Sequence, residues 1–115
     1  MIYLDNAATT AVRPEVVDAM LPYYRTNYSN PSGVYGFAGK NKNVISDARD
    51  VIASVINAKG DEIYFTSGGS ESDNWALKGI AWAYRNKGRH IITTKIEHHA
   101  ILHSCEWLEK EGYDI

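Results

Sequence analysis

The sequence of 115 residues has a single cysteine, and it has neither a long apolar run nor a large excess of charge. One cysteine, Cys105, cannot form an internal disulfide, and a lone thiol fits a reducing compartment. No apolar stretch approaches the length of about 20 residues that a membrane-spanning helix needs. The N-terminus also lacks the basic and apolar regions of a signal peptide. We therefore expect a cytoplasmic protein.

The balance of charge disfavours two classes of partner. The chain has 12 lysines and arginines and 14 aspartates and glutamates, so its formal net charge is −2 at pH 7. Binding of nucleic acid or of an anionic membrane requires a basic patch, and the cations here are scattered. The chain also lacks CxxC, HExxH and acidic clusters. We therefore predict no nucleic-acid partner, no membrane partner and no metal site.

Hydrophobic periodicity predicts a helix from Pro14 and further helices over residues 40–56, 70–86 and 101–110. Pro14 suits the first turn of a helix, because the N–H that it lacks would have no intrahelical partner there. Pro22 lies inside the same apolar pattern and is expected to end or kink that helix. Residues 28–39, YSNPSGVYGFAG, are dense in turn-forming residues and are predicted to form a loop.

Residues 62–66 and 90–94 have the composition of short strands, and residues 113–115 resemble the start of another. Strands that alternate with helices indicate an α/β fold with a parallel sheet. A parallel sheet needs several strands and cover on both faces. Because the chain stops where a further strand would begin, we expect the sequence to be incomplete.

The stretch FTSGGSESDN at residues 65–74 joins a predicted strand to a predicted helix through residues 67–70. In α/β proteins, ligands bind beyond the carboxyl ends of the strands. Glycines let a ligand approach the backbone, and the first N–H groups of a helix lack intrahelical partners, which predicts a phosphate site. The alternative is a plain glycine turn with Ser70 as the N-cap, and spacing does not separate the two. Neither GxxxxGK[ST] nor GxGxxG is present, which disfavours a P-loop or a dinucleotide site.

Two adjacent histidines, His98 and His99, follow the next predicted strand at the same edge. Imidazole titrates near neutral pH, and its flat ring can stack on a ligand. The alternative is that both are surface histidines in a loop. Cys105 shares a helical face with Ile101 and Leu108, so we interpret it as a buried structural thiol rather than a nucleophile.

The motifs LDNAATT, NPSG, FTSGGSESDNWALKG and IITTKIEHHAIL occur in the order and spacing of the cysteine desulfurases, which the whole chain resembles. These are pyridoxal 5'-phosphate (PLP) enzymes of the class V aminotransferase superfamily, with the fold-type I architecture. The resemblance implies that residues 1–115 are the incomplete N-terminal portion of the large domain, a mostly parallel sheet flanked by helices. It implies an arm at residues 1–13, helices and the NPSG loop at 14–57, and the start of the PLP-binding α/β domain at 58–115.

The resemblance also implies roles for individual residues. Gly69 and Ser70 match the pair that holds the cofactor phosphate. His98 matches the histidine that stacks on the pyridine ring and assists proton transfer, whereas no role is carried over to His99. Residues that match segments near the substrate are Asn6, Ala7, Ala8, Thr9 and Asn30.

The implied reaction converts L-cysteine to L-alanine and leaves the sulfur as a persulfide on the enzyme. A lysine holds PLP, which acts as the electron sink. The sulfur then passes to an acceptor or scaffold protein for iron–sulfur cluster assembly or thiolation, and the full-length enzyme is implied to be a homodimer. One alternative is another class V enzyme, such as a selenocysteine lyase or an aminotransferase-like relative. Another is a non-catalytic fragment that binds a phosphate compound or a partner chain.

The chain departs from the family pattern in the early loop and in its lysines. Gly33 and Tyr35 stand where the family usually has a second serine and a histidine. No lysine follows a Ser-x-His sequence, so the lysine that binds PLP and the persulfide cysteine are both expected beyond Ile115. We therefore expect these 115 residues alone to form neither a stable sheet nor an active enzyme.

Overall fold

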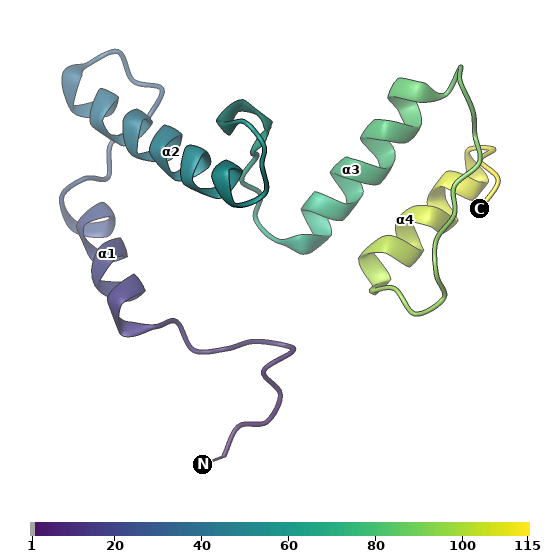
Figure 1. The fold of residues 1–115 in the computed structure, drawn as a ribbon, viewed down its shortest axis with the longest axis horizontal. Coiled ribbons are helices and arrows are strands. Elements are labelled where there is room, and N and C mark those ends of the chain that lie inside the picture. Colours follow the sequence, from purple (N-terminus) through teal and green to yellow (C-terminus); the bar gives the residue numbers. More distant parts are fainter. Residues whose placement is uncertain (1) are drawn as a thin grey trace. The chain divides into compact units, whose positions relative to one another are not determined.

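The computed structural model describes residues 2–115, in which helices are joined by loops and turns (Figure 1). The chain divides into two compact units, of which the first ends at Ile63 and the second runs from Tyr64 to Ile115. The division by role that we predict after residue 57 stays a prediction. The helical elements are α1 (Pro14–Arg25), α2 (Gly36–Val55), the 3-10 helix η1 (Gly60–Glu62), α3 (Gly69–Tyr84) and α4 (His99–Lys110).

Helix α1 begins at Pro14, as predicted, but it does not end at Pro22. The helix continues to Arg25, and the N–H groups of Thr26 and Asn27 both donate to the carbonyl of Pro22, at 2.9 and 2.8 Å. The proline removes one donor from the helix but keeps its acceptor. That acceptor closes the last turn.

Buried polar side chains hold the chain before α2 against that helix. The Asn41 side chain donates to the carbonyl of Asn27 at 2.6 Å and to the carbonyl and hydroxyl of Ser29, both at 2.9 Å. The Ser29 hydroxyl in turn donates to the carbonyl of Phe37 at 3.1 Å. Helix α2 starts at Gly36, so the predicted loop over 28–39 is wrong in its last residues.

Helices α3 and α4 pack against each other in the second unit. The buried cluster consists of Ala81, Leu108 and Tyr113, with Leu77 and Trp107 partly buried against it. The Tyr113 hydroxyl donates to the carbonyl of Ala81 at 2.6 Å, so the one polar atom that this ring brings into the cluster is paired.

Within residues 2–115 the predicted strands do not form, and the parallel sheet is unconfirmed. Glu62 ends η1, and residues 63–66 follow it without secondary structure. His90 and Asp114 form a single parallel bridge, in which the Ile91 N–H donates to the Asp114 carbonyl at 2.8 Å. A strand is defined by a ladder of hydrogen bonds to a neighbouring strand. Within residues 2–115 these segments pair with a neighbour over no more than this single bridge.

Candidate functional site

The N-terminal ends of α3 and α4 open onto one groove of about 460 Å³. Figure 1 shows the two helices side by side, with their first turns toward the same end of the unit. The groove brings together Ser70 and His98, which the sequence places at the starts of successive helices. Its lining residues are Ser70, Asn74, Lys78, His98, His99, Ala100, His103, Ser104 and Trp107.

The two glycines at the start of α3, Gly68 and Gly69, are required neither by backbone conformation nor by packing within this structure. Gly68 is extended, with φ 164° and ψ 177°, a conformation that any residue adopts. A Cβ atom added to Gly68 or Gly69 would meet no heavy atom within 4 Å. The space beside this backbone is therefore open to another molecule. Gly68 is the N-cap of α3, and Ser70 lies inside the first turn, so the alternative that Ser70 caps the helix is wrong.

The first backbone bond of α3 runs from the Ser72 N–H to the Gly68 carbonyl at 3.2 Å. The N–H groups of Gly69, Ser70 and Glu71 precede that bond and lie at the positive end of the helix dipole. Such N–H groups form a favourable binding site for an anion. The Ser70 hydroxyl adds a side-chain donor to the same turn.

Glu71 places a carboxylate beside this turn. Its Oε2 atom accepts the Ser67 N–H at 2.6 Å. The bond from the Ser67 backbone, followed by one from the Ser67 side chain, lowers the pKa of Glu71 below its usual 4.5. Glu71 is therefore ionised at neutral pH. The Glu71 carboxylate accepts the N–H of Ser67, which precedes the helix, and leaves the first N–H groups of α3 for another acceptor.

His98 is the N-cap of α4, and its Nδ1 atom accepts the Ala100 N–H at 3.1 Å. Because Nδ1 accepts, the neutral ring carries its proton on Nε2. The ring is exposed, so one face is available for a flat ligand. Both histidines do stand at a helix start, and the His99 ring stacks on His103, with centroids 5.4 Å apart.

Several groove residues were not predicted from the sequence, and among them Asn74 and Lys78 have the most informative contacts. The Asn74 side chain donates to the Ser70 carbonyl at 2.9 Å, and Lys78 Nζ donates to Asn74 Oδ1 at 2.6 Å. Lys78 Nζ also lies 4.9 Å from the centre of the Trp107 ring on α4. A signal was present, because Ser70, Asn74 and Lys78 are spaced four apart and share a helical face.

The residues expected near the substrate belong to the first unit, and their role stays a prediction. Residues 6–8 form an exposed turn, in which the Ala8 N–H donates to the Asp5 carbonyl at 3.1 Å. The Asn30 side chain accepts the Ser32 N–H at 3.0 Å and so shapes the start of the NPSG loop. In the same loop, the ring of Tyr35 lies close to Gly33, and a Cβ added to Gly33 would lie 2.8 Å from that ring.

Cys105 is 3 % exposed, which confirms a buried thiol. Burial, with a smaller effect of the Glu97 charge, raises the pKa of the thiol above its usual 9.0. Within residues 2–115, no group of three or more His, Cys, Asp or Glu side chains is placed to hold a metal ion. None of the helices described combines the length and hydropathy that crossing a membrane requires.

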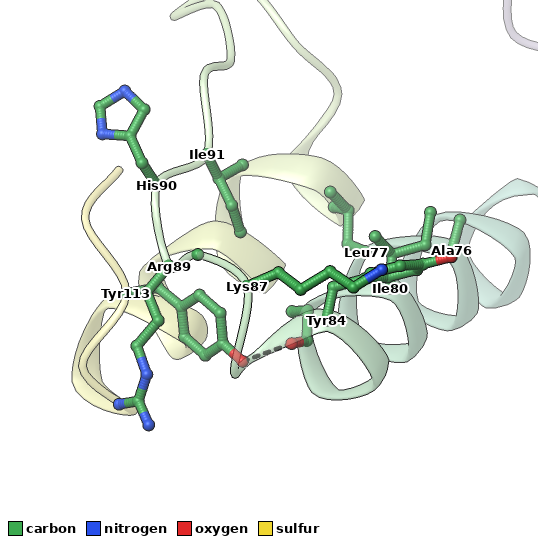
Figure 2. A pocket seen from close by; sticks show the side chains of 11 residues that line it. Ala76, Leu77, Ile80, Tyr84, Lys87, Arg89, His90, Ile91 and Tyr113 are labelled. Carbon is green, nitrogen blue, oxygen red and sulfur yellow. Dashed lines mark hydrogen bonds between the residues drawn. The ribbon is translucent and has the colours of Figure 1, made fainter.

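A second pocket, of about 400 Å³, lies beside the C-terminal half of α3 (Figure 2). Apolar side chains such as Leu77 and Ile80 line it, together with the cationic side chains of Lys87 and Arg89. Lys87 Nζ lies 4.8 Å from the centre of the Tyr84 ring. None of the predicted cofactor residues lines this pocket.

Comparison with known proteins relates the whole described chain to one family. The Aminotransferase class-V family model matches residues 2–115. A cysteine desulfurase IscS from Methanosarcina thermophila is 57% identical over 114 residues, which cover 99% of this chain and 28% of that protein. A solved NifS-like protein matches with a TM-score of 0.93 and 38% identity, over 98% of this chain and 31% of that one.

The structure of SspA in complex with cysteine matches with a TM-score of 0.90 and 41% identity, over 97% of this chain and 32% of that chain. The fold of residues 2–115 is thus similar to the N-terminal portion of NifS-like proteins. The chain spans just under a third of the length of these relatives.

Proposed function

This chain belongs to the aminotransferase class-V family, and we propose that it is the N-terminal portion of a PLP-dependent cysteine desulfurase. The observation that carries the proposal is the groove onto which both Ser70 and His98 open. An anion-binding turn and an exposed aromatic ring on one groove suit a ligand that has both a phosphate and a flat ring. The identity to desulfurases over nearly the whole chain supports the same assignment.

The residues of the groove fit the two parts of PLP. The N–H groups of Gly69 and Ser70, with the Ser70 hydroxyl, would hold the phosphate in the open space beside the glycines. Each hydrogen bond to a charged partner contributes about 1.5–3 kcal/mol. The exposed ring of His98 would stack on the pyridine. When bound, PLP supplies an electron sink for carbanion chemistry.

His98 has the properties that a proton-transfer group needs. The Ala100 N–H is bound to Nδ1, so the neutral ring donates a proton through Nε2–H and accepts one only at Nδ1, once the bond from Ala100 breaks. Imidazole is the side chain that most often transfers protons in enzymes. We assign L-cysteine as the substrate, and the related SspA structure, which contains cysteine, supports this choice. A sulfur-acceptor or scaffold protein, a homodimer and a cytoplasmic location complete the proposal.

The first experiment is the intact mass of the polypeptide that the native gene encodes, compared with the 12.9 kDa of these residues. A larger polypeptide that releases alanine and sulfide from L-cysteine would support the proposal. Release of selenide from L-selenocysteine, without sulfide from cysteine, would replace it with a selenocysteine lyase. Phosphate binding without either activity would indicate a non-catalytic binding protein.

Three variants test the assigned roles in the same polypeptide. His98→Asn keeps a good N-cap and removes the ring, so a loss of desulfurase activity would reflect the ring rather than helix stability. We expect a loss of about 10²-fold or more, as for removal of a general acid–base group. Ser70→Thr keeps the hydroxyl and should retain PLP, whereas Ser70→Ala should bind it more weakly. Full activity of His98→Asn would contradict the assigned role.

A further inference from the structure

Three residues spaced four apart on α3 form a chain of hydrogen bonds with one direction. Lys78 Nζ donates to Asn74 Oδ1 at 2.6 Å, and Asn74 Nδ2 donates to the Ser70 carbonyl at 2.9 Å. The orientation of the Asn74 amide follows from its neighbours. If the amide were rotated by 180°, its oxygen would face the Ser70 carbonyl and its NH₂ group would face the ammonium.

The end of this chain lies at the proposed phosphate turn. The Ser70 carbonyl and the Glu71 N–H belong to one planar peptide group. A donor bound to the oxygen of an amide polarises that amide and strengthens its N–H as a donor. The Glu71 N–H precedes the first intrahelical bond, so it is one of the groups directed toward an anion at the start of α3. The charge of Lys78 therefore polarises the Ser70–Glu71 peptide through the amide of Asn74.

Lys78 is held in place from the neighbouring helix. Its Nζ atom lies 4.9 Å from the centre of the Trp107 ring, and the side chain is partly buried. A cation over a tryptophan face is attracted by the ring quadrupole. The contact joins α3 to α4, whose N-cap is His98, so one side chain connects the helix of the phosphate turn with the helix of the stacking histidine.

We propose that Lys78 and Asn74 are positioning residues that raise the affinity of the α3 turn for the phosphate of PLP. The proposal rests on the proposed function, and it concerns residues to which neither the sequence motifs nor the resemblance assigned a role. In this proposal Lys78 needs no direct contact with the phosphate. It acts through the amide of Asn74 and the peptide that follows Ser70.

The test measures the affinity of the apoprotein for PLP and for pyridoxal, which has the same ring without the phosphate. Equilibrium dialysis of the polypeptide encoded by the native gene gives both dissociation constants without reference to activity. Lys78→Met keeps an apolar stem of similar length but removes the charge and the donor. We expect this variant to weaken PLP binding about tenfold. That is the lower end of the effect seen when a residue that orients the ligands of a metal ion is removed. Pyridoxal binding should stay within about twofold, because the affected turn binds the phosphate and pyridoxal has none.

Control variants separate this role from a general effect on the helix. Lys87→Met removes a lysine that also lies over an aromatic ring, that of Tyr84, but faces the other pocket (Figure 2). It should leave both affinities unchanged. Lys78→Arg keeps a donor and a cation over Trp107 and should restore most of the PLP affinity. The double variant Lys78→Met/Asn74→Ala should bind PLP no more weakly than Asn74→Ala alone, because the Lys78 effect passes through Asn74.

Each outcome bears on the proposal in a defined way. If Lys78→Met weakens PLP and pyridoxal equally, or neither, the positioning role is overturned while the proposed function stands. Additive losses in the double variant would mean that Lys78 acts without Asn74 and would also overturn it. If the unsubstituted protein binds no PLP, the proposed function fails, and the positioning role fails with it.

Discussion

The two units of the chain hold their interiors together in different ways. The first unit buries the polar side chains of Asn41 and Ser29 as well as the small side chains of Ala38 and Ala53, and hydrogen bonds connect Asn41 with Ser29. The second unit buries Leu108 completely. Around it lie Ala81 and Tyr113, and the Tyr113 hydroxyl donates to the Ala81 carbonyl at 2.6 Å.

The polar and the apolar interior specify the conformation of their units in different ways. Hydrogen bonds from a buried amide have fixed directions, so Asn41 selects one path for the loop before α2. Apolar packing is not directional, and it tolerates a change of shape better than a loss of volume. The proposed cofactor residues lie in the second unit, where packing of α3 on α4 sets the distance between Ser70 and His98. We expect the two interiors to respond to substitution in correspondingly different ways.

The largest effect is expected from the apolar interior. Leu108→Ala should lower the free energy of unfolding by about 2–5 kcal/mol, because it leaves a cavity where the side chain was fully buried. Leu108→Met is the control and should cost less than about 1.5 kcal/mol, because the volume is nearly conserved. Urea denaturation of the polypeptide encoded by the native gene measures both. A stability of Leu108→Ala equal to that of Leu108→Met would contradict the description of this core.

A smaller but more specific effect is expected from the polar interior. Asn41→Ala removes the donors to Asn27 and Ser29 and should cost about 1–3 kcal/mol, because it leaves buried acceptors unpaired. Asn41→Asp has nearly the same volume as the wild type, but its carboxylate would face carbonyl oxygens, so it should be destabilised as well. Asn43→Ala, at an exposed position of the same helix, should stay within about 0.5 kcal/mol. Equal unfolding midpoints for Asn41→Asp and the wild type would mean that volume, not hydrogen bonding, holds this interior.

The smallest effect is expected from Glu71, whose hydrogen bond to Ser67 is exposed to water. The bond lowers the pKa of Glu71 in the folded state below 4.5. A carboxyl group with a lowered pKa stabilises the fold above its unfolded pKa, and this contribution is lost as the pH falls through the folded value. The melting temperature of Glu71→Gln should therefore lie slightly below that of the wild type at neutral pH and equal it in strong acid.

Glu109→Gln, which removes a charge from an exposed position of α4, serves as the control for the general effect of charge. If the difference between Glu71→Gln and the wild type stayed constant from pH 7 down to strong acid, the bond to Ser67 would not be its source. Together with the Asn41 variants, Glu71→Gln compares the effect on stability of a buried and of an exposed hydrogen bond to the backbone in one molecule.

Much of the local structure could be predicted from the sequence. The positions of the helices followed from apolar spacing, and most ends fall within a few residues of the predicted ones. The burial of these faces could not be predicted in the same way. Val55 follows Ile52 at apolar helical spacing in the predicted helix over residues 40–56, yet it is 81% exposed, because burial depends on what packs against a helix and not on its own periodicity.

The candidate site divides in the same way. The sequence alone determined that a glycine-rich turn precedes α3 and that histidines stand at the start of α4, because residue type and chain order are enough for both. The shared groove of Ser70 and His98 is evident only from the tertiary structure. The same holds for the finding that neither backbone conformation nor packing requires glycine at positions 68 and 69. The tertiary structure also decided that Lys78 lies over Trp107, 29 positions along the chain. Such contacts depend on how two helices pack, and no local pattern of residues specifies that packing.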